Sequence, residues 1–279
     1  MTAPPREPGV RYPSRLRMLL ETRIAHICRK RLKRASKENK KAILSRTPPS
    51  LQTYNDCRFR LYPKGNYTES HLWAKGRPPE HPATMFLRDR YKGTAPVIVD
   101  VGANAGVFSL PILPVCTPDA QLLAFEPNPV MFARLAINVS LNDFANIRLF
   151  EYAIGDAPGE APLFFPSNPN LGQGRVGVAY KGINSRKGVV VRVRPLLDCL
   201  QNSGVARVDL LKVDVEGLED RVIAPLLEGP ETLLPKAIYF EDAHDEHWKY
   251  PLTQMLEKAG YGRPRRFGHN VFYLLSEDA

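Results

Sequence analysis

The segment from Val97 to Ser109 constrains the fold more than any other stretch of the chain. Its first five residues, Val-Ile-Val-Asp-Val, predict a buried strand at 97–101, and the Gly-Ala-Asn-Ala-Gly that follows predicts a tight turn. The next residues are suited to open a helix. A strand, a glycine-rich turn and a helix N-terminus form the place where α/β folds hold nucleotide-like ligands. The segment therefore predicts an α/β protein with a ligand site at the end of this strand.

The residues of this turn indicate the kind of ligand. Gly102 and Gly106 form Gly-x-x-x-Gly, whereas dinucleotide-binding turns carry Gly-x-Gly-x-x-Gly, so a dinucleotide oxidoreductase is disfavoured. Gly102 would give the turn, and Gly106 would remove a Cβ where a ligand crosses the backbone. Asp100 would accept hydrogen bonds from loop amides or hold a ligand ammonium group through water. Pro111 and Pro114 predict a short or kinked helix after the turn. A plain strand-to-helix turn without a ligand is the alternative.

A second strand end supplies a carboxylate at the spacing expected for a ribose-binding acid. The apolar run 121–125 ends at Glu126, twenty residues after Gly106. A carboxylate there can accept hydrogen bonds from both the 2′ and the 3′ hydroxyl of a ribose. Asn128 and Pro129 have the residue types favoured at an N-cap and at the first helical position. We expect Glu126 to bind ribose, and a surface acid at a strand end is the alternative.

Two further strand ends carry side chains suited to catalysis. The nearly continuous apolar run 208–215 predicts a central parallel strand, in which Lys212 and Asp214 are costly to bury unless they are paired or used. Another strand is predicted at 236–240. The carboxyl ends of parallel strands meet at one edge of a sheet, where α/β folds place their chemistry. The groups expected to converge there are Asp214, Glu216, Glu241 and His244.

The remaining pattern completes the sheet and adds one long loop. We expect a strand at 147–153, paired strands at 161–165 and 189–193, and a terminal hairpin within 263–275 that forms the antiparallel end of the sheet. The Gly-, Pro- and Asn-rich stretch 166–188 is long enough to act as a lid or as a substrate-specificity loop.

Charge divides the chain into two regions. Residues 1–50 contain fourteen Lys or Arg and three Glu, an excess of eleven positive charges, whereas the whole chain of 279 residues carries +10. The remainder is therefore close to neutral, and it is long enough to bury the core of one α/β domain. We divide the chain into a basic amphipathic arm at 1–49 and a catalytic domain at 50–279.

Apolar residues recur at helical spacing among the basic residues of the arm, which predicts a basic amphipathic helix. The apolar positions are Leu16, Leu19, Leu20, Ile24, Ile27 and Leu32. We prefer a helix docked on the domain with its basic face in solvent, and peripheral contact with an anionic membrane ranks second. Nucleic-acid binding is not expected, because no aromatic residues interleave with the basic ones for base stacking. Glu7, Glu21 and Glu38 count against an organellar transit peptide.

The sequence also bears on location. No apolar run reaches the ~18 residues of a membrane span, and the polar, proline-rich N-terminus lacks the apolar stretch of a signal peptide. The cysteines Cys28, Cys57, Cys116 and Cys199 form no Cys-x-x-Cys pair, so we expect reduced thiols rather than zinc ligands. We therefore expect a cytoplasmic protein, with any membrane contact at the inner face.

Taken together, these motifs resemble the FkbM family of S-adenosylmethionine (SAM)-dependent methyltransferases. The matching pieces run in consistent order from about Asn66 to Tyr273 and read VDVGANAGVFS, AFEPNP, AIGD, LLD, DLLKVDVEGLE and YFEDAH. The resemblance implies a Rossmann-like, class I SAM-methyltransferase fold: a seven-strand, mostly parallel sheet with a terminal antiparallel hairpin. It also implies O-methylation of a hydroxyl on a sugar, glycan or polyketide-like small molecule. N- or C-methylation, or a non-catalytic adaptor that uses the arm to bind a membrane or partner, are the alternatives.

The resemblance assigns roles to individual residues. SAM would be held by Glu80, Asp100, Gly102, Ala103, Asn104, Gly106, Glu126, Pro127, Ala153 and Asp214. The active site would be lined by Lys212, Asp214, Glu216, Glu241 and His244. The base that takes the acceptor proton would be His244 or Glu216. A divalent metal is the less favoured alternative, because no spacing is diagnostic of a tight metal site.

Overall fold

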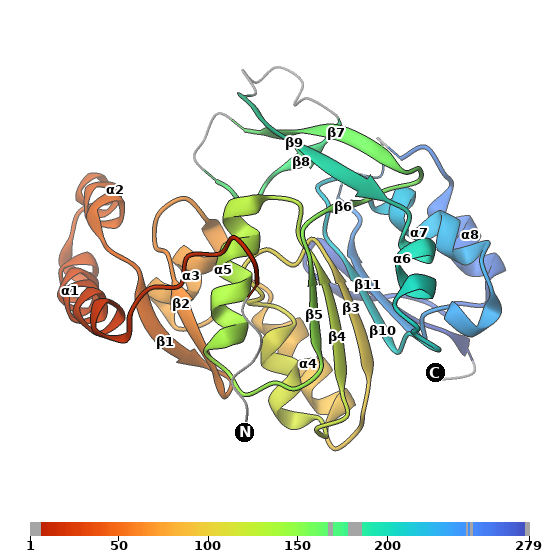
Figure 1. The fold of residues 1–279 in the computed structure, drawn as a ribbon, viewed down its shortest axis with the longest axis horizontal. Coiled ribbons are helices and arrows are strands. Elements are labelled where there is room, and N and C mark those ends of the chain that lie inside the picture. Colours follow the sequence, from red (N-terminus) through yellow and green to blue (C-terminus); the bar gives the residue numbers. More distant parts are fainter. Residues whose placement is uncertain (1–6, 167–169, 178–185, 244, 246–247, 277–279) are drawn as a thin grey trace.

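The computed structural model of the chain describes residues 7–166, 170–177, 186–243, 245 and 248–276. The strands of its central sheet are β3 (Val97–Val101), β4 (Gln121–Phe125), β5 (Ile147–Phe150), β10 (Leu210–Val213), β11 (Ala237–Glu241), β12 (Arg265–Phe267) and β13 (Asn270–Leu274). Their order is β12-β13-β11-β10-β3-β4-β5 (Figure 1). Neighbours from β11 to β5 are parallel, and β13 pairs antiparallel with β11 and β12. This topology confirms the predicted seven-strand sheet and its terminal hairpin.

Helices cover both faces of this sheet because its strands are apolar on both faces. On one face lie α4 (His81–Tyr91), the 3-10 helix η1 (Leu110–Val115) and α5 (Pro129–Ser140). On the other lie α6 (Leu196–Asn202), α7 (Glu219–Leu227) and α8 (Leu252–Lys258), with the 3-10 turn η2 (Glu231–Leu233) nearby. Within β3, Ile98 belongs to the first core, and Val99 and Val101 belong to the second. This alternation fixes the register of the strand and the direction in which its end points.

The helix after the glycine-rich turn is a six-residue 3-10 helix with Pro111 near its start and Pro114 inside it, as the prolines predicted. The strand expected at 147–153 divides in two. Its first part is β5, and its end, β6 (Ala153–Ile154), leaves the main sheet and pairs with another strand.

A smaller sheet lies beyond the carboxyl ends of the central strands (Figure 1). It has the order β6-β9-β7-β8 and adds β7 (Gly159–Phe165), β8 (Arg175–Val176) and β9 (Arg186–Arg194). Strands β7 and β9 are antiparallel, with Ala161 opposite Val191, which confirms the predicted pair. The described part of the long loop, from Asn170 to Gly174, therefore emerges above the ligand edge of the main sheet.

The N-terminal part adds helices α1 (Arg15–Arg34), α2 (Lys37–Arg46) and α3 (Tyr67–Lys75) and a hairpin of β1 (Ser50–Tyr54) and β2 (Cys57–Leu61). The backbone amides of Arg58 and Arg60 donate to the side-chain oxygens of Asn142 and Asn138, each at 2.8 Å. These bonds join the hairpin to α5 and to the turn that follows it. Within the residues that the structure describes, no helix is both long enough and apolar enough to cross a bilayer.

Helix α1 packs on the body through a face other than the predicted one. Of its six apolar positions only Leu32 is buried. Side chains that are 44–78% exposed are Leu16, Leu19, Leu20, Ile24 and Ile27. The buried side holds Ala25, and Thr22 on this side accepts a hydrogen bond from the amide of Leu51 in β1 at 2.8 Å. The expectation that the apolar stripe would dock was wrong, because small and polar residues match the hairpin better.

Candidate functional site

The loop after β3 turns sharply because several of its residues have a left-handed backbone. The φ angles of Gly102 and Asn104 are 77° and 53°. A Cβ on Gly102 would lie 1.9 Å from the backbone oxygen of Asp214, so only glycine fits between these two strand ends. The close approach brings the end of β10 against the loop, and the two segments form one continuous wall.

The packing around Gly106 and its left-handed backbone require a glycine at this position. Its φ is 76°, and a Cβ there would lie 2.7 Å from Leu110 and 2.8 Å from Leu135. The missing side chain therefore leaves room for η1 and α5 to meet behind the loop. The structure gives no support to the expectation that Gly106 clears space for a ligand.

Asp100 and Lys212 form a buried ion pair beneath the loop. Both side chains are at most 5% exposed, and Lys212 Nζ lies 3.1 Å from Asp100 Oδ1. The second oxygen of Asp100 accepts a 2.5 Å hydrogen bond from Ser109 Oγ. Asp100 thus does not accept from the loop amides, contrary to that expectation, because these amides have other acceptors. Lys212 also donates to the carbonyl of Gly102 at 2.6 Å and lies 3.7 Å from Asp214, so it fastens the loop to β10.

The charge of Lys212 is stable in this position. Burial by itself disfavours the ammonium form, but the carboxylates of Asp100 and Asp214 outweigh it and raise the pKa of Lys212 above its ordinary value. A lysine that stays protonated does not accept a proton. Lys212 therefore acts as a fixed cation that positions the loop.

Glu126 is held with both carboxylate oxygens in defined positions. One oxygen accepts from the amide of Asn104 at 2.7 Å, and the other accepts from the amide of Asn128 at 2.8 Å. Asn128 also caps α5 through Val130, as predicted. Burial raises the pKa of Glu126 to about 7, although the two amides oppose this shift. Each oxygen keeps a further lone pair for a hydroxyl donor.

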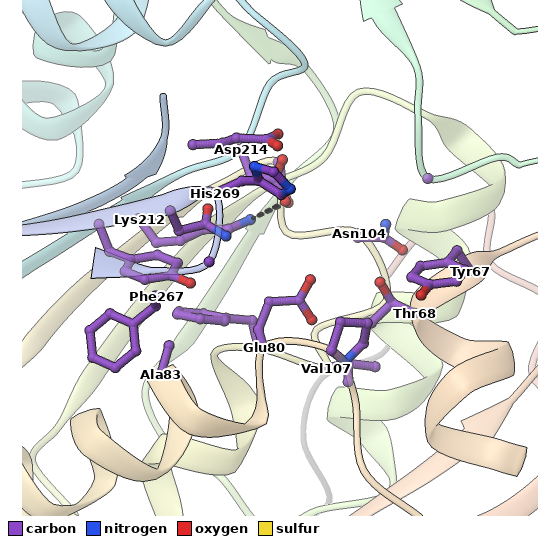
Figure 2. Close-up of a pocket in the computed structure, with 18 of the residues that line it drawn as sticks. Tyr67, Thr68, Glu80, Ala83, Asn104, Val107, Lys212, Asp214, Phe267 and His269 are labelled. Carbon is purple, nitrogen blue, oxygen red and sulfur yellow. Dashed lines mark hydrogen bonds and ion pairs between the residues drawn. The ribbon is translucent and has the colours of Figure 1, made fainter. Parts of the chain in front are cut away.

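Two cavities meet at the carboxyl edge of the sheet. The larger one has a volume of about 720 Å³, within the range of ~300–1,000 Å³ that is usual for small-molecule sites. The smaller one, about 50 Å³, contains the Glu126 side of the site. Both are lined by Gly102, Asn104, Gly172, Asp214 and Glu216. In Figure 2, Lys212, Asp214 and His269 lie on one side of the larger cavity, Thr68 and Asn104 lie on the other, and the carboxyl group of Glu80 points between them.

A loop segment lies between the two cavities. The amide of Leu171 donates to Gly65 at 2.7 Å, and the side chain of Asn128 donates to the carbonyl of Leu171 at 3.0 Å. A Cβ on Gly172 would lie 2.5 Å from the side chain of Asn104. The described part of the predicted lid or specificity loop therefore sits directly on the loop after β3.

The larger cavity concentrates carboxyl groups with raised pKa values. Burial, together with repulsion from Asp214 and Glu241, raises the pKa of Glu216 to about 8. Burial is also the main cause of the raised pKa of Glu80 and of Glu241, and Asp214 adds to both. Glu216 has a left-handed backbone with φ of 60°, which is rare outside glycine. Strained backbone and a carboxyl group that titrates near neutral pH are features of functional sites.

The structure brings most of the predicted site residues to these cavities. Those that line one or both are Glu80, Gly102, Ala103, Asn104, Glu126, Pro127, Ala153, Lys212, Asp214, Glu216 and Glu241. Asp100 and Gly106 line neither and support the loop from behind. His244 lies outside the described residues. Within the described ranges, no group of three or more His, Cys, Asp or Glu side chains is arranged to hold a metal ion.

The residues of the larger cavity that were not predicted from the sequence include His269 and Tyr239. His269 comes from the turn between β12 and β13, and it opposes the rise in the pKa of Glu241 that burial causes. The Phe-Gly-His-Asn turn of the predicted hairpin was the available signal, because this turn lies at the same edge as the parallel strand ends. Tyr239 in β11 is 2% exposed, and its ring stacks on that of Phe108 with the ring centroids 4.9 Å apart. Its hydroxyl has no hydrogen-bond partner among the described residues.

The chain is similar to known methyltransferases. Residues 100–262 match the family described as the Methyltransferase FkbM domain. Methyltransferase sdnD of Sordaria araneosa is 33% identical over 154 residues, which cover 46% of this chain and 59% of the relative. The 2-O-methyltransferase NoeI of Sinorhizobium fredii is 33% identical over 177 residues, which cover 58% of this chain and 70% of NoeI. A solved SAM-dependent methyltransferase from Aquifex aeolicus is 13% identical with a TM-score of 0.40, covering 69% of this chain and 89% of that one. The chain thus spans little more than half the length of sdnD.

Proposed function

Because the chain belongs to the family of proteins with a methyltransferase FkbM domain, we propose that it transfers a methyl group from SAM to a hydroxyl oxygen of a sugar, glycan or polyketide-like molecule. The observation that carries this proposal is the meeting of two cavities at Asp214 and Glu216. One cavity holds an acid suited to ribose, and the other holds carboxyl groups suited to a proton transfer. The name of NoeI, a 2-O-methyltransferase, supports an oxygen acceptor.

The residues present fit SAM as a cofactor. Glu126 offers two oriented oxygens to ribose hydroxyls, and Pro127 and Ala153 line the same small cavity, where an adenine would lie. Glu80 and Asp214 place carboxylates near the junction, which suits the positive charges of SAM. A cavity of about 50 Å³ is too small for an adenosine group. We therefore expect the lining of this cavity to open when the cofactor enters.

The larger cavity fits an acceptor with several hydroxyl groups. Its lining offers hydrogen-bond acceptors such as Glu80 and Glu241, and the unpartnered hydroxyl of Tyr239 offers a donor. A hydroxyl group of the acceptor can donate a hydrogen bond to the carboxyl groups and accept one from the tyrosine. Phe267 and Phe108 add apolar surface on which the flat side of a ring can pack. The lining therefore supports a polar, ring-shaped acceptor.

Glu216 is the described residue best suited to act as the general base. When bound, SAM supplies a methyl group on a sulfonium, which is an excellent leaving group. Glu216 would take the proton that the acceptor hydroxyl loses when its oxygen receives the methyl group. A base with a pKa near the working pH is efficient in this role. Lys212 holds the loop in register and stays protonated throughout.

The chain's partners and location follow from the same proposal. The acceptor is a small molecule or a glycan, and nucleic acid is not a substrate. The four cysteines are free thiols in the described chain, which suits the reducing conditions of the cytoplasm.

Calorimetric titration tests the cofactor assignment. We expect SAM to bind and NAD to give no heat of binding. Comparison of metabolites between a deletion strain and its parent then identifies the acceptor, which should appear one CH₂ unit lighter in the deletion strain. Absence of SAM binding would leave the adaptor alternative. SAM binding with a methylated nitrogen or carbon in the product would contradict O-methylation.

Glu126→Ala is expected to weaken SAM binding by roughly 2–4 kcal/mol, about 30- to 1,000-fold, because two ribose hydroxyls lose a charged acceptor. Calorimetry measures this change. In the unmodified protein, affinity should fall as the pH drops through about 7, where the Glu126 carboxylate takes up a proton. Glu151→Ala, at an exposed acid beside the next strand end, is the control. Equal affinity in the Glu126 variant and its control would rule out the ribose role.

A truncated chain that begins at Ser50 is expected to bind SAM within about 0.5 kcal/mol of the full chain, because the arm lines neither cavity and distant changes act independently. Calorimetry on both chains measures the affinity, and circular dichroism confirms that the shorter one is folded. A folded truncation that no longer binds SAM, or one that fails to fold, would contradict the domain boundary at residue 49.

A further inference from the structure

The outward face of α1 carries most of the exposed large apolar side chains in the described chain. Nine such side chains are exposed, and five of them belong to this helix. They are Leu16 (78% exposed), Leu19 (57%), Leu20 (60%), Ile24 (44%) and Ile27 (54%). Their spacing spreads them over three consecutive turns on the side that faces away from the protein. A cluster of this kind on a surface helix marks an interaction site.

The helix is held so that this face cannot turn inward. Ala25 and Leu32 are buried in the same core as the β1–β2 hairpin. Thr22 accepts from the amide of Leu51 at 2.8 Å, and Glu21 forms a 2.5 Å ion pair with Arg60. These contacts all lie on the opposite side of the helix. The apolar residues are therefore presented to the outside by a helix that is already anchored.

The charge on the outward face has one sign. Exposed basic side chains flank the apolar cluster and continue beyond its C-terminal end: Arg23, Lys30, Arg31, Lys33 and Arg34. The single acid of the helix, Glu21, points to the body and is paired with Arg17 and Arg60. We call these five apolar and five basic residues the lipid face. It combines apolar surface with basic side chains that form no ion pair with any residue in the described ranges.

We propose that the lipid face docks the protein on the surface of an anionic phospholipid bilayer. The apolar residues enter the boundary between headgroups and acyl chains, and the Arg and Lys side chains reach the lipid phosphates. A second copy of the chain fits less well, because two lipid faces would bring five positive charges against five. Nucleic acid fits less well, because the helix has no aromatic residue for stacking and five apolar side chains would have no role. The proposal does not depend on methyl transfer.

Vesicle flotation with the full chain tests the proposal. We expect binding to vesicles that contain phosphatidylglycerol and at least ~10-fold weaker binding to vesicles of phosphatidylcholine alone. Raising the salt concentration from about 0.1 M to about 0.5 M should also weaken binding, because exposed charges are screened. Equal binding to both kinds of vesicle, or binding to neither, would overturn the proposal.

A pair of matched variants assigns the binding to α1. Leu20→Asp together with Ile24→Asp should reduce binding to the anionic vesicles at least ~10-fold. The control carries Val130→Asp and Val190→Asp, which add the same charge at exposed apolar positions elsewhere and should leave binding unchanged. Circular dichroism and SAM titration show that both variants are folded. The lipid assignment would be overturned if both variants reduced vesicle binding equally. It would also be overturned if sedimentation showed a dimer that only the α1 variant abolishes.

Discussion

Glu216→Gln is expected to lower the turnover number by roughly 10²–10⁴-fold and to leave SAM affinity nearly unchanged, because the variant keeps the shape of the side chain but cannot take a proton. Transfer of a labelled methyl group from SAM to the unmethylated product of a deletion strain measures turnover. The unmodified enzyme should gain kcat/KM as the pH rises through about 8, since the Glu216 carboxyl loses its proton over this range. Because the Glu216 carboxyl interacts with the neighbouring carboxyl groups, the inflection reports on the interacting groups and not on Glu216 alone.

Two other residues compete for this role, so their variants belong to the same experiment. His269→Asn removes the histidine that lines the cavity beside Glu241, and His244→Ala removes the histidine that lies outside the described residues. Glu151→Gln, at an exposed position, is the control. The base would instead be one of these histidines if Glu216→Gln kept its turnover while a histidine variant lost turnover and still bound SAM.

Asp100→Asn is expected to lower the free energy of unfolding by about 3–5 kcal/mol, because it leaves the buried ammonium of Lys212 without its main partner. Urea denaturation measures this change. Asparagine keeps the size of the side chain and can still accept from Ser109 Oγ, so the loss reports on charge. SAM affinity should fall as well, since Lys212 holds the carbonyl of Gly102.

A double variant separates the ion pair from simple damage to the core. Asp100→Asn combined with Lys212→Met removes both charges and should recover a large part of the lost stability, because no buried charge is left unpaired. Asp119→Asn, at an exposed acid, should change stability by less than about 0.5 kcal/mol. If Asp100→Asn behaves like this exposed control, the pair does not hold the loop.

Local sequence patterns are enough to place the frame of the site. The strand at 97–101, the turn with Gly102, the acid Glu126 at the next strand end and the cap at Asn128 all lie where local patterns predicted them. These features depend on residue types over a few positions and on the rule that parallel strand ends share an edge. For the same reason the sequence pattern alone places Asp214, Glu216 and Glu241 together.

The partner that each side chain takes depends on how distant segments pack together. Asp100 was expected to bind the loop or a ligand, but it pairs with Lys212, 112 positions later in the chain. His269 reaches the cavity only because the terminal hairpin lies beside β11. Such contacts depend on strand order and register, which local spacing does not encode.

The orientation of α1 shows the same limit. Helical spacing established that the arm has an apolar side, but it could not establish that this side faces outward. The β1–β2 hairpin offers an amide to Thr22 and a guanidinium to Glu21, and the small Ala25 allows close packing. A periodic pattern defines the faces of a helix, whereas the surface that receives the helix decides which face is buried.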